Sequence, residues 1–229
     1  MQRRRILDAA RSAFTTVGYD AATVAQIATE ANVARPVVYE TVGDKENLLL
    51  AVAEEMSEEL VTAFDERFAR PGQVELPLSE VVREDLAWFV AWIRAHPSFV
   101  NITRLSSALA AHGPDPAAHA RRRIEDRLTE LHIRRAQRWG VQRGESARII
   151  SLLVISLAEA VAYRLDVEDS WPAEATAAIA IEFATGGYLQ IEGAGMEAAN
   201  RFDGLVSRRP STTSDAQEGV DAEGDAFGQ

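Results

Sequence analysis

The side chains best suited to binding nucleic acid fall between residues 23 and 45 of the chain. Arg35 can reach a guanine edge or a phosphate group, and Val37 can contact the methyl group of a thymine. Tyr39 can donate its hydroxyl group to a phosphate. Lys45, the only lysine in the chain, is expected where a helix begins, so its ammonium group and the free backbone N–H groups could together hold a phosphate.

Each of these side chains also has a purely structural interpretation. Thr23 would cap a helix whether or not DNA is near, although its hydroxyl group could also contact a phosphate there. Tyr39 could cover a small hydrophobic core, and Lys45 could pair with a neighbouring group. The arginines near the N-terminus could contact the DNA backbone or simply remain solvated. Whether these side chains bind DNA or have a structural role depends on the helices that carry them.

Apolar spacing predicts two helices before the candidate residues at positions 35–45. Apolar residues between positions 6 and 17 recur with a helical period, and Gly18 is a typical C-terminal stop. Thr23 stands three residues before Gln26, which is the spacing of a capping box at the start of a helix. The second helix is expected to be only about two turns long.

Two further helices are expected after a short connection at residues 30–34. Arg35 and Pro36 favour a helix start, because proline is preferred in the first turn, and Gly43 favours its end. Asp44 can cap a fourth and much longer helix. The two short helices and their connection have the proportions of a helix-turn-helix motif.

The N-terminal sequence contains five ordered motifs: Ile6-Leu7-Asp8-Ala9-Ala10, Phe14-Thr15-Thr16-Val17-Gly18-Tyr19, Thr23-Val24-Ala25-Gln26-Ile27-Ala28, Val33-Ala34-Arg35-Pro36-Val37-Val38-Tyr39 and Lys45-Glu46-Asn47-Leu48-Leu49. Through these motifs, about residues 3–55 resemble the N-terminal domain of TetR-type transcriptional regulators. The resemblance implies a homodimeric repressor that places its third helix in the major groove of an operator and is released by a small effector. The positions expected to contact DNA are Thr23, Arg35, Pro36, Val37, Tyr39, Thr41 and Lys45.

The sequence departs from the family pattern in the recognition helix. Ala34 stands where a serine or threonine usually caps this helix, Thr41-Val42 replaces the common aromatic pair, and Glu40 adds a negative charge. These departures from the family pattern predict an unusual operator preference.

The charge balance of the chain opposes strong non-specific binding to DNA. The net charge is −11, of which five negative charges lie after Ser211, where no lysine or arginine occurs. Residues 1–55 carry six basic and eight acidic side chains, a net charge of −2. We therefore expect weak non-specific affinity and a specificity that depends on a few groups around Arg35, Tyr39 and Lys45.

The remaining sequence predicts an all-α fold. Helices are expected at about 79–96, 97–111, 116–140, 145–165 and 171–192, because breakers or helix starts separate these periodic segments. We expect a helix-turn-helix DNA-binding domain at residues 1–50, a larger helical effector-binding and dimerisation domain at 51–206, and a disordered acidic tail at 207–229.

Large apolar side chains cluster in the middle of the chain. As a group they could wall a mostly apolar ligand pocket, whereas ordinary core packing explains any single one of them. The residues of this candidate pocket are Phe64, Phe68, Trp88, Phe89, Trp92, Phe99, Ile102, Leu105, Leu109, His132 and Trp139. His132 could bond to a ligand, or it could be a satisfied or exposed histidine.

The last two predicted helices mix large apolar and small residues, which permits close helix approach. The resemblance implies that this pair, 145–165 and 171–192, forms a four-helix dimer interface, and packing within one chain is the alternative. The residues are Ile149, Ile150, Leu153, Val154, Leu157, Val161, Ile179, Ile181, Phe183, Gly186, Gly187 and Tyr188.

Several other classes of protein fit the sequence less well. Neither a signal peptide nor a membrane span is recognisable, so we expect a cytoplasmic protein. Cysteine is absent and the four histidines lack metalloprotease spacing, so we expect no metal, no cofactor and no enzyme activity. Residues 193–198 fit a dinucleotide-binding pattern but follow a helix rather than a strand. A helical interaction protein without specific DNA binding remains the alternative.

Overall fold

The computed structural model describes residues 1–72, 78–96, 98–110, 115–138, 145–167 and 173–193. Over these residues the chain forms helices and no strand, which confirms the predicted all-α fold. The helices are α1 (Gln2–Thr16), α2 (Val24–Glu30), α3 (Arg35–Thr41), α4 (Lys45–Phe68), α5 (Leu78–Ala95), α6 (Phe99–Leu109), α7 (Pro116–Arg138), α8 (Glu145–Val167) and α9 (Ala173–Gly193).

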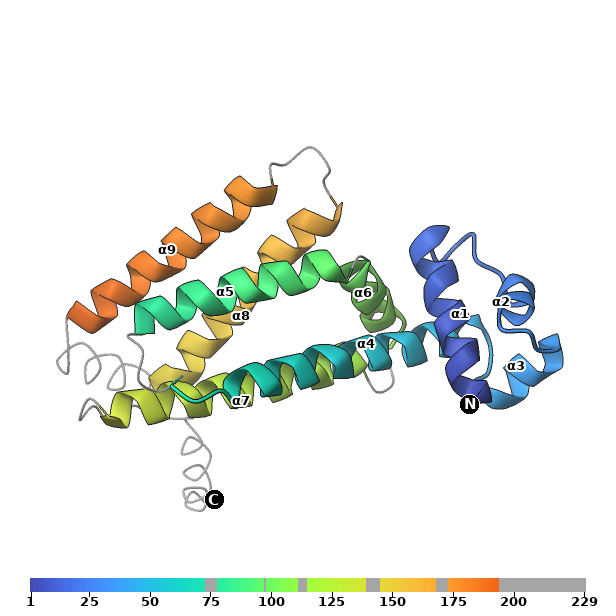
Figure 1. Ribbon diagram of the computed structural model, residues 1–229, viewed down its shortest axis with the longest axis horizontal. Helices are drawn as coiled ribbons and strands as arrows, with labels where there is room; N and C mark the ends of the chain where they lie inside the picture. Colours follow the sequence, from blue (N-terminus) through green and yellow to red (C-terminus); the bar gives the residue numbers. More distant parts are fainter. Residues whose placement is uncertain (73–77, 97, 111–114, 139–144, 168–172, 194–229) are drawn as a thin grey trace, which may run out of the picture.

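Helices α1 to α3 form a small unit at one end of the molecule (Figure 1). The apolar stripe of α1 is buried along its length, at Ile6, Ala10 and Phe14, and packs against the start of α4. Val38 of α3 is fully buried in the same core. Each short helix thus buries one face, and its opposite face is left to solvent.

Local capping explains where these helices begin. The predicted capping box of α2 is present, because Thr23 Oγ1 accepts from the backbone N–H of Gln26 at 3.2 Å and Gln26 Oε1 accepts from the Thr23 N–H at 2.9 Å. Asp44 caps α4 by accepting from the backbone N–H of Asn47 at 2.9 Å. Gly43 precedes this cap with φ +118°, a conformation that side-chain-bearing residues rarely adopt.

Helix α4 joins the N-terminal unit to the rest of the protein. Its 24 residues span about 36 Å, and Figure 1 shows it running from α1 along the body of the molecule beside α7. Its first half, to Met56, belongs to the N-terminal core, and residues from Leu60 onward belong to a second core. The two domains expected from the sequence therefore share one continuous helix.

The second part of the molecule is a bundle of α4 to α9. Helix α7 packs against α4 and α8, α9 lies along α5, and α6 bridges α4, α7 and α8 (Figure 1). The side chain of Trp92 and those of Ile93, Ile124 and Leu128 are buried in its core.

Two features are absent from the part of the chain that the structure describes. No helix there is long and apolar enough to cross a membrane. No group of three or more His, Asp or Glu side chains in the same residues is placed to hold a metal ion. The predicted acidic tail at 207–229 lies outside the described residues.

Candidate nucleic-acid interface and ligand cavity

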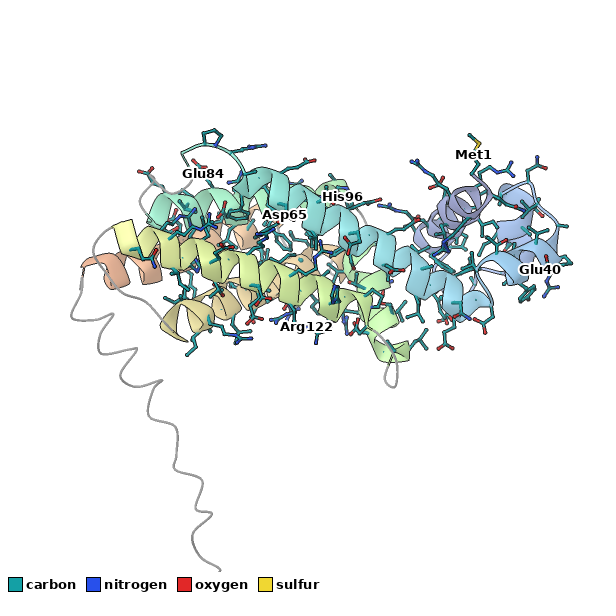
Figure 2. All side chains as sticks on the ribbon, turned by 90° about the horizontal axis from the view of Figure 1, so that it is seen from below. Met1, Glu40, Asp65, Glu84, His96 and Arg122 are labelled. Atoms are coloured by element: carbon teal, nitrogen blue, oxygen red, sulfur yellow. The ribbon has the colours of Figure 1, made fainter. Side chains whose placement is uncertain are left out.

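Helix α3 turns most of the predicted DNA-contacting residues towards solvent. Arg35 and Pro36 are exposed and the Tyr39 residue is 43% exposed, whereas Val37 and Thr41 are half-buried. Figure 2 places Glu40 of the same helix at the outer tip of the N-terminal unit. The exposed side of α3 therefore carries an arginine, a tyrosine and one carboxylate.

Arg35 and Tyr39 are held together one turn apart on that side. Arg35 Nη2 donates to the Tyr39 hydroxyl oxygen at 3.2 Å, and the guanidinium carbon lies 5.7 Å from the centre of the tyrosine ring. The phenol oxygen accepts in this bond, so the tyrosine O–H is left to donate. The pair forms an exposed polar edge with several donors for phosphate oxygens or base edges.

Lys45 ties the start of α4 to the turn that follows α1. Its Nζ donates to the backbone carbonyl of Asp20 at 3.0 Å and lies 4.5 Å from the centre of the Tyr19 ring. The ammonium group has three donors, so this bond leaves two of them for a phosphate. Tyr19 was not among the residues predicted to form the interface. The signal for it was its position directly after Gly18, where the first helix is expected to end.

Burial raises the pKa of Tyr19, and the nearby carboxylates of Glu46, Asp44 and Asp20 raise it further. The phenol therefore stays neutral, and its ring face is available to the Lys45 ammonium group. The same carboxylates surround the lysine with negative charge, which limits the positive potential at this end of the molecule.

Thr23 is exposed, but its hydroxyl group is already engaged. Besides accepting from the Gln26 backbone, Thr23 Oγ1 donates to Gln26 Oε1 at 2.8 Å. The structural role of Thr23 as an N-cap is therefore present, and a contact with a phosphate requires the hydroxyl hydrogen to turn away from Gln26.

A cavity of about 930 Å³ lies between α4, α5, α6, α7 and α8. This volume is at the upper end of the range of about 300–1,000 Å³ for small-molecule sites. Of the residues predicted to wall a pocket, the cavity is lined by Phe64, Trp88, Phe89 and Phe99. The Phe64 and Trp88 rings meet edge to face, with their centres 6.0 Å apart.

The other described residues that were predicted to wall the pocket do not line the cavity. The Phe68 ring packs on the Phe64 ring with their centres 4.1 Å apart and their planes tilted by 36°, and Trp92 packs between His96 and Phe99. Ile102 is buried in the N-terminal core, and Leu105 packs against that core. Leu109 is exposed. His132 is buried, and its ring Nδ1 lies 2.9 Å from Ser151 Oγ. Trp139 lies outside the described residues.

The polar lining of the cavity was not predicted from the sequence, because only large apolar side chains were expected to form a pocket. The polar and charged lining residues are Ser57, Asp85, Thr103, Arg104, Ser107, Asp115, Arg121, Glu159 and Tyr163. The available signal was the presence of charged residues within the apolar faces of the helices.

An apolar face remains uncovered on α8 and α9. Leu153 is 63% exposed, Ile179 70% and Phe183 75%, and Ile149 and Leu152 are also exposed. A Cβ added at Gly186 or Gly187 would meet no atom within 4 Å. The other predicted interface residues pack inside the chain: Ile150, Val154, Leu157 and Ile181 lie on a cluster with Val82 and Leu86, and Val161 is buried. The side chain of Tyr188 lies outside the described residues.

The N-terminal part of the chain matches a known family of proteins. Residues 6–52 match the model of the family described as bacterial regulatory proteins, tetR family. No curated protein matches the sequence.

Solved structures of regulators share the fold at low sequence identity. The fatty acid degradation regulator FadR from Bacillus halodurans is 17% identical, with 80% of this chain and 94% of that chain covered and a TM-score of 0.62. FadR from Bacillus subtilis in complex with stearoyl-CoA is 15% identical, with 80% and 98% covered and a TM-score of 0.62. A TetR-like regulator from Rhodococcus sp. RHA1 is 21% identical, with 81% and 94% covered and a TM-score of 0.58. Residues 6–52 of this chain thus match the tetR family of bacterial regulatory proteins, and the fold of most of the chain is similar to that of solved transcriptional regulators, one of them TetR-like.

Proposed function

We propose that the protein is a repressor that binds a palindromic operator in double-stranded DNA and is released when a small, mostly apolar effector fills the cavity. The observation that carries the proposal is the exposed Arg35–Tyr39 edge on α3, within the segment that matches the family. A helix of this size fits the major groove, where arginine can contact guanine in a bidentate manner. Lys45 and Thr23 then lie at helix starts, where phosphates are held.

The uncovered face of α8 and α9 supports a homodimer. Its exposed side chains would be buried if the same face of a second chain packed against it, and the small residues Gly186 and Gly187 allow the helices to approach closely. A symmetric dimer would present two copies of α3 to the two half-sites of a palindrome.

The position of α6 supports communication between the cavity and the DNA-binding unit. Phe99 lines the cavity and also packs on the N-terminal core, to which Ile102 of the same helix belongs. An effector that displaces Phe99 would therefore disturb the packing that sets α4 against α1. FadR from Bacillus subtilis was solved with stearoyl-CoA, so a protein of this fold accepts a ligand with a long apolar chain.

A second candidate function is a helical interaction protein that does not bind DNA specifically. The net charge of −11 favours it, because DNA repels a negatively charged protein.

The test is a fluorescence anisotropy titration against the DNA that flanks the protein's own gene, at two salt concentrations. Arg35→Ala should weaken binding to the specific site by about 1–3 kcal/mol and change non-specific binding much less. Lys45→Ala should weaken binding to all sequences and lower the salt slope by about 1.

The matched control is Arg122→Ala, because Figure 2 places Arg122 on the body of the molecule, far from α3. This variant should bind DNA like the wild type. Unchanged titrations for both Arg35→Ala and Lys45→Ala would overturn the interface, and equal affinity for all sequences would favour the interaction protein.

A further inference from the structure

The charged residues of the cavity lining indicate the chemical class of the effector. This inference rests on the proposed function. Five lining residues carry a formal charge: Asp85, Arg104, Asp115, Arg121 and Glu159. A charged side chain that already has a partner inside the protein contributes little to the affinity for a ligand, because the ligand would have to displace that partner.

Arg121 and Glu159 neutralise one another. Arg121 Nε donates to Glu159 Oε1 at 2.8 Å, and its Nη1 lies 3.6 Å from Glu125 Oε2. Arg121 Nη2 also donates to Ser156 Oγ at 3.3 Å. The guanidinium group of Arg121 is therefore engaged on three sides.

The two aspartates are also satisfied. Asp85 Oδ1 accepts from Arg67 Nε at 2.9 Å. Asp115 Oδ1 accepts from the backbone N–H groups of Ala117 at 3.0 Å and Ala118 at 3.2 Å, and from Ser107 Oγ at 3.1 Å. Neither carboxylate is left to bind a cationic ligand.

Arg104 differs from the other four charged residues. Its guanidinium carbon lies 4.5 Å from the centre of the Tyr163 ring, and no carboxylate of the described residues lies within ion-pair distance of it. Arg104, Glu159 and Ala160 are the exposed members of the lining, so they mark the rim where the cavity meets solvent. Most of the remaining lining is apolar, with buried side chains such as Leu60 and Phe64.

We propose that the effector is an amphipathic anion, with an apolar body against Phe64, Trp88 and Phe89 and an oxyanion head group on Arg104. A guanidinium group binds a carboxylate or a phosphate through two parallel N–H···O bonds, so both head groups share this chemistry. The Tyr163 ring fixes the arginine from one face, and the edge of the guanidinium group, which carries the donors, remains for the anion.

The experiment measures the affinity of the full chain for decanoate and for 1-decanol by calorimetry. The two probes have the same apolar body and differ in the charged head group. The wild type should bind decanoate about tenfold more tightly than 1-decanol, equivalent to about 1.4 kcal/mol. Arg104→Gln should bring the two affinities together while leaving 1-decanol binding unchanged, and Arg104→Lys should restore part of the difference.

The matched control is Arg122→Gln, which removes a charge from an exposed position of α7 outside the cavity and should keep the preference for decanoate. Decanoyl-CoA serves as the phosphate-bearing probe. Tighter binding of decanoyl-CoA that also depends on Arg104 identifies the phosphate groups of coenzyme A as the head group, and weaker binding identifies the free carboxylate.

Equal affinity of the wild type for decanoate and 1-decanol would overturn the anion site but leave the apolar cavity and the proposed function standing. A preference for decanoate that survives in Arg104→Gln would overturn the role of Arg104. Failure of all three probes to bind would overturn the ligand cavity itself and the anion site with it.

Discussion

Arg67 and Asp85 form a buried ion pair between α4 and α5, beside the wall of the cavity. Their side chains are almost entirely removed from solvent, and the Arg67 guanidinium carbon lies 5.6 Å from the centre of the Trp88 ring. Burial raises the pKa of Asp85, and the charge and hydrogen bond of Arg67 oppose that shift. Each partner therefore depends on the other to compensate its loss of hydration.

Asp85→Ala should lower the free energy of unfolding by about 3 kcal/mol, because it leaves the Arg67 guanidinium group buried without its carboxylate. The double variant Arg67→Met, Asp85→Leu should recover most of this loss, since it removes both charges and fills the space. Urea denaturation at one fixed protein concentration measures both. The control Glu66→Ala, at an exposed position of α4, should change stability by no more than about 0.5 kcal/mol. A double variant as unstable as the single one would contradict this account.

At the scale of helices, the starts of α2 and α4 could be predicted because their caps are local. Thr23 and Asp44 each bond to a backbone N–H only three residues away, so neighbouring sequence is sufficient. Helix α3 begins at Arg35 without a side-chain cap at Ala34, as the departure from the family pattern predicts.

The partners of residues on one helix could not be predicted in the same way. Phe99 and Ile102 lie three residues apart on one side of α6, but only Phe99 reaches the cavity while Ile102 is buried in the N-terminal core. The apolar period of a sequence predicts which side of a helix is buried. The element that this side contacts at each turn depends on how α6 packs against α4, which the period does not contain. The paired charges around the cavity depend on such contacts between distant helices, so apolar spacing could not reveal them.

The exposed face of α8 and α9 leads to a prediction about assembly. Phe183→Glu places a charge where the proposal packs a second chain, so it should convert the proposed dimer to a monomer in sedimentation experiments. A monomer contacts only one half-site at a time, so operator binding should weaken by about a hundredfold or more. The control is Leu109→Glu, which makes the same kind of change at another exposed apolar position, at the end of α6. A variant of Phe183 that stays dimeric would show that the interface lies elsewhere.

At the scale of the whole molecule, the distribution of charge matters more than its sum. Five of the negative charges follow Ser211, and several acidic residues of the long helices are engaged in ion pairs, such as Glu59 with Arg11 and Glu58 with Arg123. The α3 edge instead presents Arg35 and Tyr39 to solvent. This arrangement predicts weak non-specific affinity together with selective binding of one site.

The central claim is that this protein recognises a particular DNA sequence through two copies of α3. Nuclease footprinting of the wild type on the DNA that flanks its own gene tests the claim most directly. We expect protection of a roughly palindromic site whose half-sites are about one helical turn, or a multiple of it, apart, with Arg35→Ala losing that protection. Binding without any protected site, or protection that Arg35→Ala leaves unchanged, would contradict the account.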